Sequence, residues 1–246
     1  MTRFYGVERS VLHSPAWFVP VDEFTGRVRA AGVAVELDRF DAAANAWLPE
    51  DVRAVRTPSA AIAYPGLGRR GAPARFRARF TAAGFAPLYP ADDEPFAADV
   101  VGVEFRTFPY DEDRPPVELA APRVVRLLPG TAFPYGPGVR TAYGVAVDAA
   151  TRVPVANALV AAEGVSGVEG VPWRERTLTD GRGAFRLALR WEGGAEGADE
   201  TFRLVATERP GRTGSVLVRL PADRGRGHVI EITGSDRPAQ PNSRES

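Results

Sequence analysis

The sequence predicts an all-β protein built from two β-sandwiches in tandem. Short segments in which apolar and polar residues alternate recur along the chain, as expected for strands with one buried face. The composition agrees with this interpretation, because 25 Gly and 22 Pro among 246 residues suit short strands joined by turns. A third observation is that similar residues recur at a constant spacing in the two halves of the chain.

The first half of the chain, residues 15–130, is expected to form the first sandwich after an N-terminal arm at residues 1–14. Its clearest strand lies within residues 32–38, where alternation places Val33, Val35 and Leu37 on one face. An insertion at residues 88–99 makes this half irregular. We expect strands at residues 16–22, 32–38, 53–64 (two short strands), 75–81, 99–108 and 123–128.

A segment rich in Gly and Pro separates the two halves, and residues 131–139 are the predicted linker. The second sandwich is expected at residues 140–233, and the polar residues 234–246 are expected to form a disordered tail. Strands of the second half are predicted at residues 142–147, 158–162, 176–179, 184–191, 201–207, 214–220 and 227–232.

The strongest local signal is an Asp-Gly turn between two alternating segments, which predicts a β-hairpin. Asp180 tolerates the unusual backbone angles of such a turn, and Gly181 or Gly183 is expected to adopt a positive φ. After the turn, Phe185 and the alternating leucines lie on one face, so we expect Phe185 to be buried between two sheets.

The same region resembles a known family. The pattern from Thr177 to Leu187, Thr-x-Thr-Asp-x-x-Gly-x-Phe-x-Leu, is similar to that of carboxypeptidase regulatory-like domains, which are transthyretin-like (Ig-like) sandwiches. The resemblance covers residues 143–232 and implies a noncatalytic module. Upstream residues fit the family pattern D-x-x-T-x-x-P-V-x-x-A-x-V, namely Asp148, Thr151, Pro154, Val155, Ala158 and Val160.

The first half is interpreted as a diverged copy of the second. Asp22 and Asp148 are 126 positions apart (148 − 22), and Phe76 and Phe202 have the same spacing (202 − 76). The copies differ at the turn, where Pro-Ser-Ala-Ala follows Thr57 in place of the Asp-Gly sequence. We therefore expect two sandwiches in which Phe76 and Phe202 occupy equivalent strands.

Composition excludes several classes of function. The formal net charge is zero, so we expect no nucleic-acid partner and no attraction to an anionic membrane. The absence of cysteine excludes disulfides, thiolate metal sites and cysteine nucleophiles. The N-terminus lacks the apolar segment of a signal peptide, and no segment has the length of a membrane span. A cytoplasmic protein is the resulting expectation.

Candidate metal and catalytic residues are few. His13 and His228 are far apart in the sequence and lack the spacing of a zinc site, so we predict no catalytic residue, metal or cofactor. Two acidic clusters, at residues 92–94 and 111–113, could supply oxygen ligands for calcium. Neither has the alternating spacing of a calcium loop, which favours solvated loops.

The remaining candidates are binding residues. Trp47 and Trp173 lie close to prolines in predicted loops, and Arg69 and Arg70 belong to the densest basic group. We expect a structural or adaptor protein that binds a protein partner through loops or sheet edges. The resemblance suggests a setting, because cap, baseplate and spike-tip proteins of phage-tail-like contractile injection systems resemble such sandwiches. The alternative is a carbohydrate-binding module that uses Trp47 and Trp173.

Overall fold

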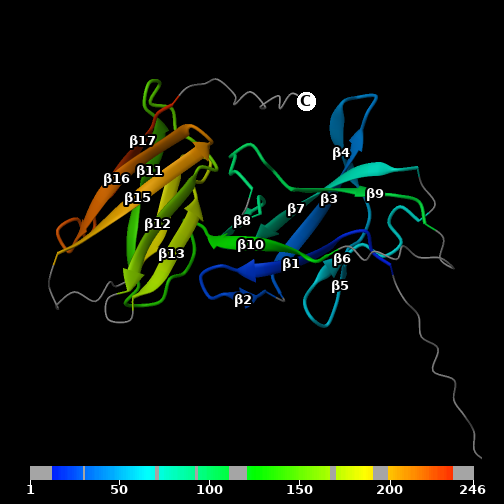
Figure 1. Ribbon diagram of the computed structural model, residues 1–246, viewed down its shortest axis with the longest axis horizontal. Helices are drawn as coiled ribbons and strands as arrows, with labels where there is room; N and C mark the ends of the chain where they lie inside the picture. The colour runs from blue at the N-terminus through cyan, green and yellow to red at the C-terminus, as the bar shows by residue number, and fades with distance from the viewer. Residues whose placement is uncertain are drawn as a thin grey trace, which may run out of the picture. The chain divides into compact units, whose positions relative to one another are not determined.

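The regular structure of this protein is entirely β in the described residues, where the computed structural model has no helix (Figure 1). The all-β prediction is confirmed. Since there is no helix, nothing in the described part of the chain qualifies as a membrane-spanning helix. The predicted arm (residues 1–14) and tail (residues 234–246) fall almost entirely outside the residues that the structure describes. The described residues are 13–29, 31–69, 72–91, 94–110, 121–166, 170–190 and 199–234.

The chain folds into two compact units, and neither is continuous in sequence. Unit 1 comprises residues 1–20, 28–80 and 102–124, whereas unit 2 comprises residues 21–27, 81–101 and 125–246. Parts of the first half therefore belong to the same unit as the predicted second sandwich. The domain boundaries expected from the sequence remain a prediction.

Unit 1 contains two groups of hydrogen-bonded strands. In one group β3 pairs with β4 and β7, and β9 pairs with β7; in the other β6 lies between β1 and β5, and β2 pairs with β1. Phe18 of β1 contacts Phe80 of β7 and Phe105 of β9, with ring centroids 5.3 and 5.9 Å apart. These aromatic contacts join the two groups into a sandwich-like core. The strands are β1 (Trp17–Asp22), β2 (Arg27–Val28), β3 (Val33–Asp41), β4 (Ala46–Glu50), β5 (Val55–Arg56), β6 (Ile62–Ala63), β7 (Ala74–Ala82) and β9 (Val103–Thr107).

Unit 2 is built on a sandwich of a three-stranded sheet, β14-β11-β17, and a four-stranded sheet, β13-β12-β15-β16. Inward side chains of both sheets form one core, in which Phe185, Leu204 and Ile230 are buried. The prediction that Phe185 lies between the sheets is confirmed. The strands are β11 (Arg140–Asp148), β12 (Leu159–Ser166), β13 (Val171–Leu178), β14 (Ala184–Leu189), β15 (Glu200–Arg209), β16 (Arg212–Leu220) and β17 (Gly227–Ile232).

The predicted hairpin at Asp180 is wrong, although the turn itself forms. Strand β13 pairs with β12 and strand β14 pairs with β11, so the chain crosses from one sheet to the other at this turn. The carboxylate of Asp180 accepts hydrogen bonds from the backbone N–H groups of Arg182 and Ala184, both at 2.9 Å. Gly183 has φ of 72°, as expected for this turn. Alternation indicates which side chains face inward, but it does not indicate which strand is the partner.

The two halves share backbone details that support the internal repeat. Asp22 accepts hydrogen bonds from the N–H groups of Phe24 and Thr25, and Asp148 accepts them from Ala150 and Thr151. Each pair of donors lies two and three positions after its aspartate. The same spacing therefore produces the same turn at the end of β1 and at the end of β11.

The turn whose residue types differ between the two halves has the same backbone geometry in both. The N–H of Ala61 bonds the hydroxyl of Thr57 at 3.1 Å, as the N–H of Ala184 bonds the Asp180 carboxylate. Ala60 has φ of 65° where Gly183 has 72°. The two copies therefore differ in residue types at this turn, as the sequence shows, and share its backbone geometry.

Equivalent strands of the two halves also pair in equivalent register. Phe18 of β1 lies opposite Ile62 of β6, while Gly144 of β11 lies opposite Phe185 of β14. Phe76 and Phe202 lie two positions into β7 and β15, which pair with β3 and β12 respectively. These registers agree with the tandem arrangement predicted from the sequence.

Segments from the first half are attached to the sandwich of unit 2. Strands β8 (Phe85–Leu88) and β10 (Arg123–Pro129) pair with each other. Leu88 and Leu128 pack with Leu178 of β13 in a small buried cluster. The guanidinium of Arg176, on the same strand, bonds both carboxylate oxygens of Glu23, at 2.5 and 2.8 Å.

The predicted linker, residues 131–139, is anchored by aromatic residues. The ring of Phe133 lies 5.7 Å from that of Phe24 and 5.1 Å from that of Phe85. Tyr135 stacks edge-on against Phe24 at 5.3 Å, and the Arg186 guanidinium lies 5.0 Å from the centroid of its ring. Contacts with Phe24, Phe85 and the Arg186 side chain therefore hold this segment within unit 2.

Candidate functional site

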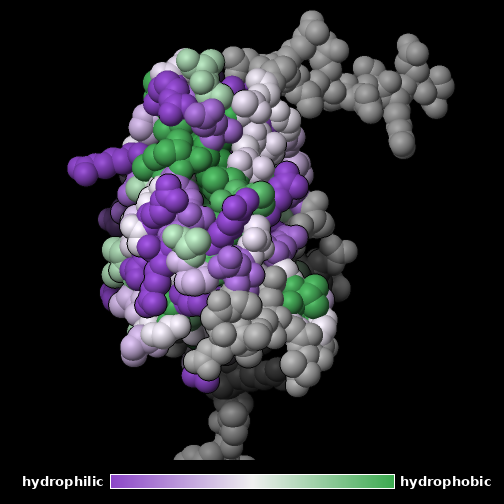
Figure 2. All heavy atoms as spheres, turned by 90° about the vertical axis from the view of Figure 1, so that its left-hand side faces the viewer, coloured by the Kyte–Doolittle hydropathy of each residue, from purple (hydrophilic) through white to green (hydrophobic). Residues whose placement is uncertain are grey.

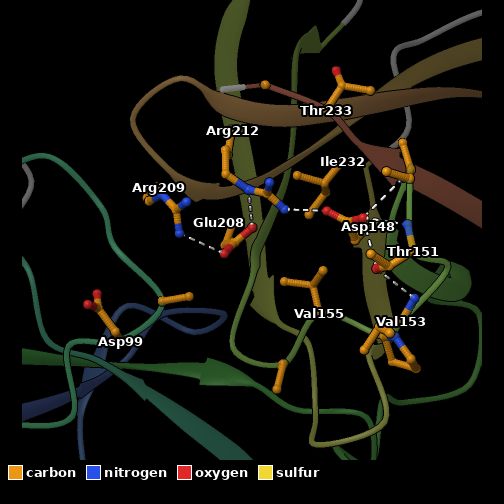
Figure 3. Close-up of a pocket in the computed structure, with 16 residues that line it drawn as sticks. Asp99, Asp148, Thr151, Val153, Val155, Glu208, Arg209, Arg212, Ile232 and Thr233 are labelled. Atoms are coloured by element: carbon orange, nitrogen blue, oxygen red, sulfur yellow. Dashed lines mark hydrogen bonds and ion pairs between the residues drawn. The ribbon is translucent and has the colours of Figure 1, made fainter. Parts of the chain in front are cut away.

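A pocket of about 770 Å³ opens in unit 2 (Figure 3). Four separate segments form it: the loop at residues 98–99, the turn and extended segment at 148–156, the β15–β16 turn at 208–212, and the end of β17 at 232–234. Ala98 is tied to the sandwich, because its N–H donates to the carbonyl of Glu208 at 2.8 Å. The loop that the sequence marks as an insertion thus supplies one wall.

Asp148 lies at the end of β11 and is fixed by the turn that follows. One carboxylate oxygen accepts hydrogen bonds from the N–H of Ala150 at 3.0 Å and from the N–H and hydroxyl of Thr151 at 2.8 and 2.9 Å. The other oxygen accepts a bond from Arg212 Nη2 at 2.6 Å. The hydrogen bonds from Thr151, followed by the one from Arg212, hold the pKa of Asp148 well below its usual range.

Arg212 connects Asp148 to a second carboxylate. It lies at the start of β16, and its Nε donates to Glu208 at 2.6 Å, while Glu208 also accepts from Arg209 at 3.2 Å. Arg212 is only 8% exposed, and hydrogen bonds to Asp148 and Glu208 raise its guanidinium pKa. Asp148, Arg212, Glu208 and Arg209 therefore form one ion-pair network, which we call the Arg212 network.

The remaining wall of the pocket is largely apolar. Val153, Val155 and Ile232 line it, and Val153 is 59% exposed. Asp99 lies on the other side of the pocket from Asp148 in the close-up view (Figure 3). In the described part of the chain, Asp99 has neither a hydrogen bond nor an ion pair through its carboxylate. The pocket thus combines an apolar wall, a compensated ion-pair network and one unpaired carboxylate.

This arrangement suits binding better than acid–base chemistry. A general acid or base works best with a pKa near the operating pH, whereas Asp148 and Arg212 are both shifted away from neutrality. The described residues contain no group of three or more His, Asp or Glu side chains that could hold a metal ion. The chemistry that the pocket offers is therefore fixed charge beside exposed apolar surface.

The tryptophans predicted to bind ligands do not form a shared platform. Trp173 lies in β13, not in a loop, and is 7% exposed because it packs against Phe202 in the core of the sandwich. Its predicted role in carbohydrate binding is wrong, since a sugar cannot stack on a buried ring. Trp47 lies in β4, where the guanidinium of Arg77 lies 4.7 Å from the centroid of its ring.

Among the described residues, the other predicted candidates also lie outside the pocket. Arg69 is half-buried in the loop between β6 and β7 of unit 1. Arg70, most of the first acidic cluster and all of the second fall outside the described residues. His13 packs edge-on against Tyr110 at 4.5 Å in unit 1, whereas His228 is in β17 of unit 2.

Sequence reasoning missed the pocket because its four segments are distant along the chain. The Asp148–Thr151 pattern was visible, and it marks the turn correctly. Nothing in the sequence pairs Asp148 with Arg212, which is 64 positions away (212 − 148). The alternation of β15 and β16 could have identified Arg212 as an inward-facing charge that needs a buried partner.

Comparisons with known proteins give limited matches. No family model matches the chain, and no curated protein matches it. Among solved structures, a streptococcal ancillary pilin matches 90% of this chain at 13% identity, with a TM-score of 0.28. BcpA, the major pilin subunit of Bacillus cereus, matches 88% at 10% identity and a TM-score of 0.26. The matches cover 62% and 68% of those two pilin chains.

Proposed function

We propose that this chain is a noncatalytic structural or adaptor protein that binds a protein partner through the loops and edges of its sandwiches. The observation that carries the proposal is the pocket of unit 2, where the Arg212 network supplies fixed charges beside an apolar wall. Asp148 stays ionised because its pKa is lowered, and Arg212 stays protonated because its pKa is raised. Such groups orient a bound surface but do not exchange protons near neutral pH.

Exposed apolar side chains support the same proposal. Tyr143 and Val229 lie on neighbouring strands of the three-stranded sheet and are 41% and 46% exposed. Leu217, on the four-stranded sheet, is 55% exposed. Figure 2 shows hydrophobic side chains gathered in a band between hydrophilic ones. Contiguous apolar surface of this kind is characteristic of protein interaction sites.

A finer proposal rests on the resemblance to carboxypeptidase regulatory-like, transthyretin-like domains. On that basis the chain serves as a cap, baseplate or spike accessory component of a phage-tail-like contractile injection system. The tandem arrangement supports this setting, because two sandwiches present more edges and loops to an assembly than one.

Affinity purification of the native protein tests the general proposal. We expect a protein partner to remain bound through washing, and elemental analysis of the purified chain to find no stoichiometric metal. Stoichiometric zinc, iron or calcium would overturn the proposal. So would hydrolysis of an ester, peptide or glycoside substrate that a single carboxylate substitution abolishes.

A further inference from the structure

We infer that the free edge of β16 binds an extended, acidic segment of the partner, which adds as a further strand to the four-stranded sheet of unit 2. The inference rests on the function proposed above, because it names the edge that the partner occupies and the chemistry of the segment that fits it. Backbone hydrogen bonding, the sequence of β16 and the charge around it support the inference.

Hydrogen bonds at the two ends of β16 show which backbone groups lie on its free edge. The N–H and C=O of Thr213 both bond Thr233, at 3.0 Å, and so point away from β15. The N–H of Arg219 donates to the Asp223 carboxylate at 2.8 Å, and the C=O of Arg219 accepts from the N–H of Asp223 at 2.7 Å. Both ends of the edge are therefore already bonded.

Between these ends the backbone of β16 is open. Successive residues of a strand direct their N–H and C=O groups to alternate sides, so Ser215 and Leu217 face away from β15 as Thr213 does. The register of β15 and β16 is regular from Glu200 to Thr207, so no bulge reverses this direction. β16 is the last strand of its sheet, and no hydrogen bond joins these groups to another described residue. Two donors and two acceptors are thus available to an added strand.

Strand β17 does not close this edge. Among the described residues, the bridge between Thr213 and Thr233 is isolated and no ladder continues from it. A Cβ at Gly214 would lie 2.2 Å from the carbonyl oxygen of Glu231, so the two backbones touch only where glycine permits it, next to the bridge. The bridge therefore marks one end of the open segment, and the bonds between Arg219 and Asp223 mark the other.

The open segment lacks the features that protect most edge strands. Natural edges carry charges, prolines or bulges that prevent pairing with another chain. Residues 213–218, Thr-Gly-Ser-Val-Leu-Val, contain no charge and no proline, and Leu217 is 55% exposed. Figure 1 draws β16 at the left of unit 2, and Figure 2 faces that side, where hydrophobic side chains form a band. Such an edge suits the addition of an extended peptide through main-chain hydrogen bonds.

The charge along this edge favours an acidic segment. The side chain of Arg203, on β15, reaches across to β16, where its Nη2 lies 3.4 Å from the hydroxyl of Ser215. Arg219 is exposed on the same face of the sheet. Asp223 lies close to Arg219 but also pairs with Arg226 at 3.1 Å, so one carboxylate is shared between two cations. Acidic side chains of an added strand would complete the charge balance.

A second copy of β16 fits this edge less well. In an antiparallel pair of copies, Ser215 would lie opposite Leu217 of the other copy, and Arg203 and Arg219 of both copies would line one seam. Like charges on neighbouring strands destabilise their pairing. An acidic segment places opposite charges there instead.

Hydrogen exchange of the full chain, measured by NMR, tests whether the edge is open. We expect the N–H groups of Ser215 and Leu217 to exchange at least about tenfold faster than those of Val216 and Val218, which face β15. Equal protection of all four would overturn the inference, because the edge would already be paired. Protection that rises with protein concentration would also overturn it, in favour of a second copy.

An acetylated and amidated heptapeptide of alternating glutamate and valine is the probe for the occupant. We expect it to shift the amide signals of Ser215 and Leu217 and to slow their exchange. A peptide with lysine in place of glutamate reverses the charge, and one N-methylated at the glutamates lacks the donors that face β16. An equal effect of either control peptide would overturn the inference.

Arg219→Ser should weaken binding of the peptide by about two- to fivefold, the value of one surface ion pair. Arg182→Ser is the matched control, because Arg182 is an exposed arginine in the turn between β13 and β14. Equal affinity of the two variants would contradict the proposed role of Arg219. Leu217→Pro removes an outward N–H at a position where an edge strand tolerates proline, and should prevent binding.

Partner capture with Leu217→Pro and Arg219→Ser separates this inference from the proposed function. A partner that stays bound to both variants would overturn the assignment of the edge and leave the proposed function standing. Failure of the wild-type chain to retain any partner would instead refute the proposed function.

Discussion

Tyr64 shows how a single buried side chain makes this fold sensitive to alkaline pH. Its ring is 1% exposed in unit 1, and its hydroxyl is buried without a hydrogen-bond partner in the described structure. Burial raises the pKa of Tyr64 to about 12, because the charged phenolate is poorly solvated there. The buried hydroxyl therefore destabilises the folded state at neutral pH, and its ionisation at higher pH destabilises that state further.

We predict that Tyr64→Phe stabilises the protein by about 1 kcal/mol at neutral pH, since the substitution removes an unsatisfied buried hydroxyl. Below about pH 10 tyrosine is neutral in both the folded and the unfolded chain, so its ionisation does not reduce stability there. Between about pH 10 and the folded-state pKa of about 12, the unfolded chain ionises more readily than the folded one, and the wild-type protein loses stability; the variant should lose less over this range.

Urea denaturation at pH 7 and at several alkaline pH values measures both effects. Tyr143→Phe is the comparison, because that ring is 41% exposed and its hydroxyl, unlike that of Tyr64, donates a hydrogen bond to the Gly225 carbonyl, so this substitution should not stabilise the protein. A loss of more than about 1 kcal/mol in Tyr64→Phe at neutral pH would show that the hydroxyl has a partner, such as a buried water.

At the scale of elements, the turn after β13 determines how the two sheets of unit 2 connect. Asp180 and Gly183 were identified from the sequence, and their local geometry follows from residue type. The pairing of the adjoining strands was not predictable in the same way, because one period-two pattern serves a hairpin and a crossing between sheets equally. The Thr57 turn shows the converse, where a different sequence forms the same backbone bonds.

Gly183→Ala should destabilise the protein by at least about 1–2 kcal/mol, because φ at this position is 72° and alanine is strained there. A Cβ at Gly183 would also meet the carbonyl oxygen of Ala146 at 2.6 Å. Gly181→Ala is the matched control two residues away, since a Cβ there has nothing within 4 Å.

The control should change the free energy of unfolding by less than about 0.5 kcal/mol. Chemical denaturation of the two variants gives the comparison. Equal losses at both glycines would show that the turn has another conformation in solution.

At the scale of the whole molecule, periodicity predicted the fold class and most strand positions, because burial of one face determines which residues alternate. It did not predict that residues 21–27, 81–101 and 125–129 belong with the second half in one compact unit. Such contacts join segments far apart in the sequence, so no local pattern predicts them. For the same reason the sequence did not predict the Arg212 network. Local patterns also suggested binding roles for Trp47 and Trp173, which instead pack against an arginine and inside the protein.

The composition of unit 2 leads to a prediction about truncation. A fragment of residues 140–246, the second sandwich and tail as the sequence divides them, lacks the Glu23 carboxylate that pairs with Arg176, a side chain 5% exposed in the full chain. It also lacks Leu88 and Leu128, which pack against Leu178. We expect the free energy of unfolding of the fragment to be at least about 3 kcal/mol lower than that of unit 2 in the full chain, since breaking a buried ion pair alone costs about that much.

Glu23→Gln in the full chain should reproduce part of the loss, whereas Arg174→Ala, at an exposed position on the same strand, should not. Urea denaturation compares the four proteins, and a fragment as stable as the full chain would show that residues 140–233 form a domain of their own.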